Sequence, residues 1–128
     1  MRRIQNRLSL LILPLLVFFL LSCKGEPGTP PIQHPFIYEI TGTAIRVDLR
    51  YQDPRRGGYT EILNVSLPWT KDLMYLEPDE VGNPYYLSAQ NITSAGSVTV
   101  SVYIDGFLEK TETNANAFGF VALYGTTP

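Results

Sequence analysis

From residue 36 onward, apolar and polar residues alternate with a period of two. Apolar residues alternate with charged ones over 45–51, and with Thr, Ser and Tyr over 98–104. Alternation of this kind gives a β-strand one face to bury and one face to expose to water. Asp105-Gly106 follows the second segment and favours a two-residue hairpin turn, because both positions accept positive φ angles. The sequence therefore predicts a β-hairpin over 98–113.

Other segments of the chain carry weaker strand patterns, separated by turn-rich stretches. They are 36–41, 59–66, 70–76, 85–90 and 117–124. No segment has a convincing amphipathic helical period. Short antiparallel strands in this number predict an all-β fold for residues 36–128, an immunoglobulin-like antiparallel β-sandwich of about seven strands.

The N-terminus has the pattern of a bacterial lipoprotein signal. Three arginines within the first seven residues precede an apolar run over 8–21, which ends in Leu20-Leu21-Ser22-Cys23. A signal peptide has a basic start and an apolar core of about this length. We expect residues 1–22 to be the signal peptide and Cys23 to carry the lipid that anchors the protein in a membrane. An uncleaved signal anchor, or a secreted protein with an incidental cysteine, are the alternatives.

Residues 23–35 are expected to form a tether after the lipidated cysteine. Four prolines and two glycines fall within 24–35, and such a composition favours extended, unpaired backbone. His34 lies in this stretch and is interpreted as a solvated linker residue rather than a metal ligand. Lys24 stands where enteric lipoproteins of the inner membrane carry an aspartate. We therefore expect the protein in the bacterial cell envelope, lipid-anchored on the outer membrane.

Charge and residue types narrow the classes of function. Without the three arginines of the signal, seven of the ten basic residues remain against twelve acidic ones, a net charge of −5. A chain without a basic stripe is a poor candidate for nucleic-acid binding. Cys23 is the only cysteine, so no disulfide is expected, and the predicted domain has no histidine to serve catalysis. The sequence predicts a non-catalytic protein without a metal or cofactor.

Four segments, taken in order, resemble the MmpS family. They are 38–44 (YEITGTA), 65–69 (VSLPW), 87–91 (LSAQN) and 98–106 (VTVSVYIDG). MmpS proteins are small extracytoplasmic proteins that accompany lipid- and siderophore-exporting transporters of the resistance-nodulation-division (RND) type. The resemblance runs from Tyr38 to about Gly125, and it implies a compact β-sandwich at a membrane with an accessory role. Family members typically carry a transmembrane helix and a cysteine pair, one position of which falls near Val100. This chain has neither feature and is expected to use lipid on Cys23.

Aromatic residues on the expected strands are the candidate contact residues. Tyr59, Tyr103 and the adjacent Tyr85 and Tyr86, which point to opposite faces of their strand, could form a patch for a sugar or a partner protein, and Trp69 could stack on a ligand. For Trp69 the sequence favours a place in the core, with the indole N–H bonded to a carbonyl, over contact with a ligand. The resulting hypothesis is an accessory or scaffold domain for an RND-type transporter or another envelope protein. The alternative hypothesis is a surface-exposed adhesin or glycan-binding lipoprotein.

Overall fold

The structure is a computed structural model that describes residues 28–128. The predicted signal peptide (1–22), the cysteine expected to carry lipid (Cys23) and the first part of the predicted tether lie outside the described residues. The strands are β1 (Ile32–Thr41), β2 (Arg46–Gln52), β3 (Tyr59–Ser66), β4 (Trp69–Glu77), β5 (Pro84–Asn91), β6 (Val98–Ile104), β7 (Phe107–Asn114) and β8 (Phe120–Thr126). In the described part of the chain, no helix is long and apolar enough to cross a membrane.

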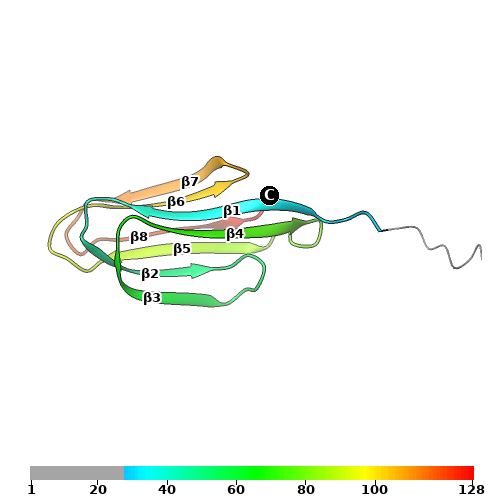
Figure 1. Cartoon of the computed structure of the whole chain (residues 1–128). Helices are drawn as coiled ribbons and strands as arrows, with labels where there is room; N and C mark the ends of the chain where they lie inside the picture. The colour runs from blue at the N-terminus through cyan, green and yellow to red at the C-terminus, as the bar shows by residue number, and fades with distance from the viewer. Residues whose placement is uncertain (1–27) are drawn as a thin grey trace, which may run out of the picture. The chain divides into compact units, whose positions relative to one another are not determined.

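The eight strands form two antiparallel sheets that pack face to face (Figure 1). Sheet A has the strand order β4-β1-β6-β7, and sheet B has the order β3-β2-β5-β8. The predicted all-β antiparallel sandwich is confirmed, with eight strands rather than about seven. Only β2–β3 and β6–β7 are hairpins within one sheet, and every other connection passes from one sheet to the other.

The core consists of the inward-facing residues of both sheets, as the period of two predicts. In β1 the inward residues are Phe36, Tyr38 and Ile40, all fully buried. Val100 and Val102 of β6 are fully buried beside them, and Leu49 and Leu87 close the core from sheet B. Burial of apolar surface at about 25 cal/mol per Å² is the main force that holds the two sheets together.

Strand β1 begins earlier than the sequence predicts. Residues 32–35 pair with residues 74–77 of β4. The prediction that 32–35 belong to the tether is therefore wrong, because these residues are part of the sandwich. Pro35 is tolerated because β6 pairs with β1 only from Phe36 onward. At Pro35, β1 is paired with β4 alone. The missing N–H of proline is therefore accommodated on the side that has no ladder partner. His34 is therefore a residue of the domain, not of a linker.

Two turns have the geometry that their residues favour. Asp105 and Gly106 both have positive φ angles, 53° and 82°, and this confirms the predicted hairpin between β6 and β7. At the opposite end, Gly42 has φ 136°, and a Cβ there would lie 2.1 Å from the carbonyl oxygen of Ser97. Only glycine fits at this close approach of two loops.

Tyr38 carries a hydroxyl from sheet A into sheet B. It donates a hydrogen bond to the carbonyl of Gln52 at 2.6 Å and accepts one from the backbone N–H of Tyr86 at 3.1 Å. Burial raises the pKa of the Tyr38 phenol far above its usual range, so the hydroxyl keeps the proton that it donates. One side chain of β1 thus joins β2 and β5 across the core.

Replacement of Tyr38 by Phe tests this contact. The Tyr38→Phe variant keeps the ring but leaves a carbonyl of β2 and an N–H of β5 without their partner. An unpaired buried polar group costs about 1–3 kcal/mol, so urea unfolding should show a loss of that size. A variant as stable as the wild type would mean that water replaces the hydroxyl at no cost.

The register of β6 is tested by alanine substitutions. Val100→Ala and Val102→Ala remove buried methyl groups, and each should lower the free energy of unfolding by about 1–3 kcal/mol. Thr99→Ala should cost less, because Thr99 lies on the outer face, where it bonds Thr113 on β7. Equal, small losses at all three positions in denaturant unfolding would contradict the register.

Candidate functional site

A row of tyrosines crosses the outer face of sheet B. The strand register places Tyr59 of β3 opposite Gln52 of β2, Gln52 opposite Tyr86 of β5, and Tyr86 opposite Tyr124 of β8. Side chains at directly opposed positions share one face of a sheet. These four residues, with Arg50 next to them on β2, are called the tyrosine face below.

Two of the three rings of the tyrosine face are in contact, and two of the three are largely open to solvent. The ring centroids of Tyr59 and Tyr86 are 5.6 Å apart in an edge-to-face arrangement. The Arg50 guanidinium lies 4.1 Å from the centroid of the Tyr59 ring, a cation–π contact. Tyr59 is 55% exposed and Tyr124 is 74% exposed, whereas Tyr86 is half-buried. The face therefore combines exposed aromatic surface with two rings, those of Tyr59 and Tyr86, that are held by their contacts.

A groove of about 730 Å³ continues from the tyrosine face over β8 towards β7. Its lining residues are Gln52, Tyr59, Pro84, Tyr85, Tyr86, Glu109, Lys110, Tyr124, Gly125 and Thr126. Lys110 reaches from β7 of sheet A to the carbonyl of Tyr124, to which it donates a hydrogen bond of 2.6 Å. A Cβ at Gly125 would lie 2.5 Å from the Tyr85 hydroxyl and 3.1 Å from the Lys110 Nζ, so the absence of a side chain there leaves room for both.

The structure brings together two of the aromatic residues that the sequence singled out. Tyr59 and Tyr86 lie on the tyrosine face. Trp69 packs against the core, as the favoured interpretation expected, with its ring 5.7 Å from that of Tyr51. Tyr103 lies on the outer face of sheet A, where its hydroxyl contacts Glu39, so both sheets separate it from Tyr86. Trp69 and Tyr103 do not belong to the tyrosine face.

Tyr124 is the tyrosine of the face that sequence reasoning missed, and Gln52 and Arg50 of the same face were not singled out either. Tyr124 falls at the end of a segment predicted as a strand, with alternating apolar residues at Val121 and Leu123. That alternation predicts that Tyr124 faces outward. The row itself depends on which strands are neighbours and in what register, and neither follows from alternation within one strand.

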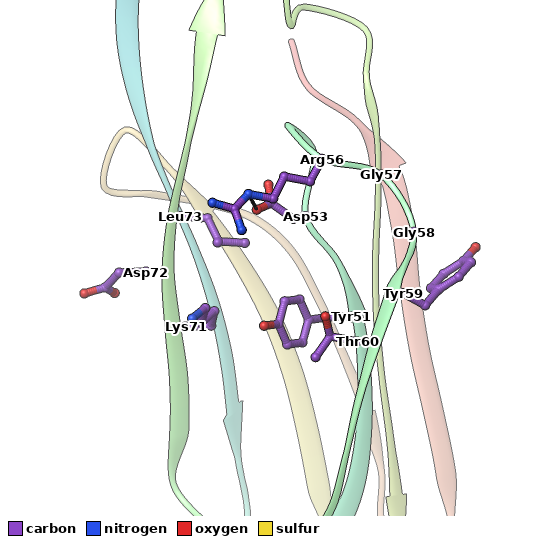
Figure 2. Close-up of a pocket in the computed structure, with 10 residues that line it drawn as sticks. All are labelled: Tyr51, Asp53, Arg56, Gly57, Gly58, Tyr59, Thr60, Lys71, Asp72 and Leu73. Carbon is purple, nitrogen blue, oxygen red and sulfur yellow. Dashed lines mark ion pairs between the residues drawn. The ribbon is translucent and has the colours of Figure 1, made fainter.

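A second hollow, of about 300 Å³, lies between the edge strands β3 and β4, where the two sheets are not closed on each other (Figure 2). Figure 2 shows Tyr51 pointing into it and Tyr59 pointing away. Its charged lining residues are two acids, Asp53 and Asp72, and two bases, Arg56 and Lys71. The balance of charge favours neither an anion nor a cation as a ligand.

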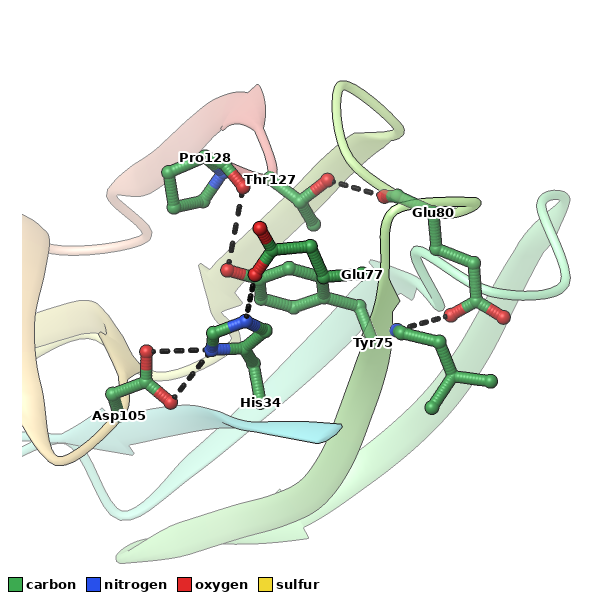
Figure 3. Close-up of polar contacts among 8 residues, drawn as sticks. His34, Tyr75, Glu77, Glu80, Asp105, Thr127 and Pro128 are labelled. Atoms are coloured by element: carbon green, nitrogen blue, oxygen red, sulfur yellow. Dashed lines mark hydrogen bonds and ion pairs between the residues drawn. The ribbon is translucent and has the colours of Figure 1, made fainter. Parts of the chain in front are cut away.

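His34 forms a separate polar cluster at the end of the sandwich where β1 begins (Figure 3). Its ring stacks on Tyr75 of β4, with centroids 4.7 Å apart. Nε2 lies 2.8 Å from a carboxylate oxygen of Glu77, and Nδ1 lies 2.8 Å from one of Asp105. The ring thus links the start of β1, the end of β4 and the turn between β6 and β7.

The cluster favours the charged form of His34. Two hydrogen bonds raise the pKa of His34 above its ordinary value. The bond to Glu77 has the largest effect, and the bond to Asp105 has the second largest. Both ring nitrogens are engaged by carboxylates, so neither is free to accept a proton from a substrate. Within residues 28–128, no group of three His, Cys, Asp or Glu side chains is arranged to hold a metal ion.

Comparisons with known proteins add nothing to these observations. No protein-family model matches the chain, and no curated protein matches it.

The His34 cluster predicts a dependence of stability on pH. His34 has a raised folded-state pKa, so its contribution is complete below the unfolded value of about 6.5 and is lost as pH rises through the folded value. The His34→Gln variant should therefore lose more stability, relative to the wild type, at about pH 5.5 than at about pH 9. Urea unfolding at both pH values measures this.

Arg55→Gln is the matched control for His34→Gln. It breaks the ion pair between Arg55 and Glu80, of 3.0 Å, a pair that contains no histidine. The loss of stability in Arg55→Gln should be the same at both pH values. A loss in His34→Gln that is equally independent of pH would show that the ring contributes only by stacking on Tyr75.

Proposed function

We propose that this protein is a lipid-anchored, non-catalytic accessory protein of the bacterial cell envelope that works by binding another envelope component. The lipoprotein pattern at Leu20-Leu21-Ser22-Cys23 supports the anchor, and the MmpS resemblance supports the accessory role. The observation that carries the proposal is the tyrosine face, a row of exposed aromatic residues on a rigid sheet. Tyrosine is enriched where proteins make contacts, because its ring is both apolar and able to hydrogen-bond.

The length of the tether suits a contact close to the membrane. Eight residues, 24–31, separate Cys23 from the first residue of β1. Fully extended, they would span at most about 28 Å. A domain held at that height meets membrane-embedded partners at a high effective concentration.

Two classes of partner follow from different observations. The MmpS resemblance favours a transporter of the RND type, or another envelope protein. The groove beside the tyrosine face favours a glycan, since tyrosine rings and hydrogen-bonding side chains line it together. In both cases the binding surface is the outer face of sheet B.

Photo-crosslinking in the producing bacterium tests the proposal. A photoreactive phenylalanine analogue is placed at position 124, which is 74% exposed on the tyrosine face. Irradiation of intact cells should link the protein to an envelope component, and mass spectrometry of the product identifies its class. The same analogue in a Cys23→Ser background should give little product, because that variant cannot take the lipid.

Ile45 is the control position for this experiment. It is also 74% exposed but lies in the turn before β2, at the opposite end of that strand from Gln52. The proposal predicts products at position 124 and few at position 45. Equal products at both positions, or none at position 124, would contradict a contact through the tyrosine face.

A further inference from the structure

We infer that the tyrosine face and its groove bind an extended β-1,4-linked saccharide chain. This inference rests on the proposed function and names the chemical class of its ligand. The chemistry of the lining residues, the length of the tyrosine row and the rigidity of its support each argue for this ligand.

The lining residues match the two kinds of surface that a sugar ring offers. A pyranose has C–H groups on its faces and hydroxyl groups around its edge. Tyr59, Tyr86 and Tyr124 supply aromatic surface for the faces, whereas Gln52, Glu109 and Lys110 supply donors and acceptors for the hydroxyls. Among the described residues that line the groove, none is Leu, Ile, Val, Met or Phe. Such a lining offers little to a purely aliphatic partner.

The length of the row favours a chain over a single sugar. Tyr59 and Tyr124 lie on strands separated by β2 and β5, so three inter-strand spacings, about 14 Å, separate them. One pyranose ring is much shorter than this. A β-1,4-linked chain is a flat ribbon, and the row of tyrosines crosses a sheet face on which such a ribbon can lie.

The charges in and beside the groove suit an uncharged polyhydroxyl ligand. Arg50 is stacked on Tyr59, and Lys110 is hydrogen-bonded to the carbonyl of Tyr124. The Glu109 carboxylate lies in the same lining as Lys110. Because both signs are present and the two cations have partners on the protein, no single charge dominates the surface. Hydrogen bonding and stacking are then the forces that select the ligand.

The protein holds two of the three rings of the face, those of Tyr59 and Tyr86, in place before a ligand arrives. The Tyr38 hydroxyl fixes the backbone at Gln52 and Tyr86, two members of the row. The edge-to-face contact with Tyr86 and the Arg50 guanidinium restrain the Tyr59 ring. Side chains that are already ordered lose little entropy on binding, which strengthens the weak contacts that sugars make.

Isothermal titration calorimetry of the mature, lipidated full chain in detergent tests the inference. The soluble probes are cellotetraose and N-acetylchitotetraose, and co-sedimentation with purified peptidoglycan sacculi is the insoluble arm. Binding to sacculi and N-acetylchitotetraose would indicate the cell wall as the source of the glycan. Binding to cellotetraose alone would indicate a glycan from outside the cell wall. Either pattern supports a saccharide ligand.

Substitutions on the tyrosine face test whether the ligand binds there. Tyr124→Ala removes a ring that is not part of the core, and it should weaken saccharide binding about tenfold or more. Tyr124→Phe keeps the aromatic surface and should bind within about threefold of the wild type. Ile45→Ala, at an equally exposed position far from the row, should bind as the wild type does. Far-ultraviolet circular dichroism confirms that each variant is folded.

Two results would overturn the inference. One is that neither tetrasaccharide nor the sacculi bind the wild-type protein. The other is that saccharide binding persists unchanged in Tyr124→Ala and Tyr59→Ala. If position 124 nevertheless crosslinks to an envelope protein in cells, the saccharide ligand is refuted while the proposed accessory function stands. If neither a saccharide nor a crosslink is found at the tyrosine face, both fail.

Discussion

Tyr38 carries a polar hydroxyl into the contact between the two sheets, within a core made mainly of apolar side chains. There it pairs a carbonyl of β2 and an N–H of β5, so the core contains a directional contact as well as apolar burial. Apolar burial alone tolerates small sliding of one sheet over the other, because it depends on area and not on direction. The two hydrogen bonds of Tyr38 fix the position of sheet A on sheet B.

The same contact connects the core to the outer surface. The backbone groups that Tyr38 bonds belong to Gln52 and Tyr86, whose own side chains point the opposite way, onto the tyrosine face. The Tyr38 hydroxyl thus restrains Gln52 and Tyr86, and these two residues connect the ordered core to the row of exposed rings. The His34 cluster plays a comparable part at the end of the sandwich, since it ties three chain segments together next to the start of β1.

Much of the fold could be predicted from the sequence, because alternation within a strand is a local property. The strands over 59–66 and 98–104 begin and end as predicted. The start of β1 could not be predicted, because the prolines before Phe36 argue against a strand when read locally. Pairing with β4 on one side overrides that preference. His34 was misplaced for the same reason, since its partners Glu77 and Asp105 are distant in the sequence.

The candidate site depends even more on information that one strand does not carry. Alternation places Tyr86 outward, as it places Tyr103 outward, yet the two residues lie on opposite sides of the molecule because β5 and β6 belong to different sheets. Which tyrosines share a face is decided by strand order. The register between β5 and β8 then brings Tyr124 next to Tyr86. The sequence therefore indicated that tyrosines form the site, but not which tyrosines belong to it.

The central claim is that the outer face of sheet B is occupied in the envelope, and hydroxyl-radical footprinting tests it most directly. The lipidated protein is oxidised after purification and also in native membranes, and mass spectrometry gives the labelling rate of each tyrosine. The account predicts that Tyr59 and Tyr124 are labelled readily in the purified protein and are protected in the membranes. Tyr103, on the outer face of sheet A, should be labelled equally in both. Equal labelling of Tyr59 and Tyr124 in both preparations would contradict the account.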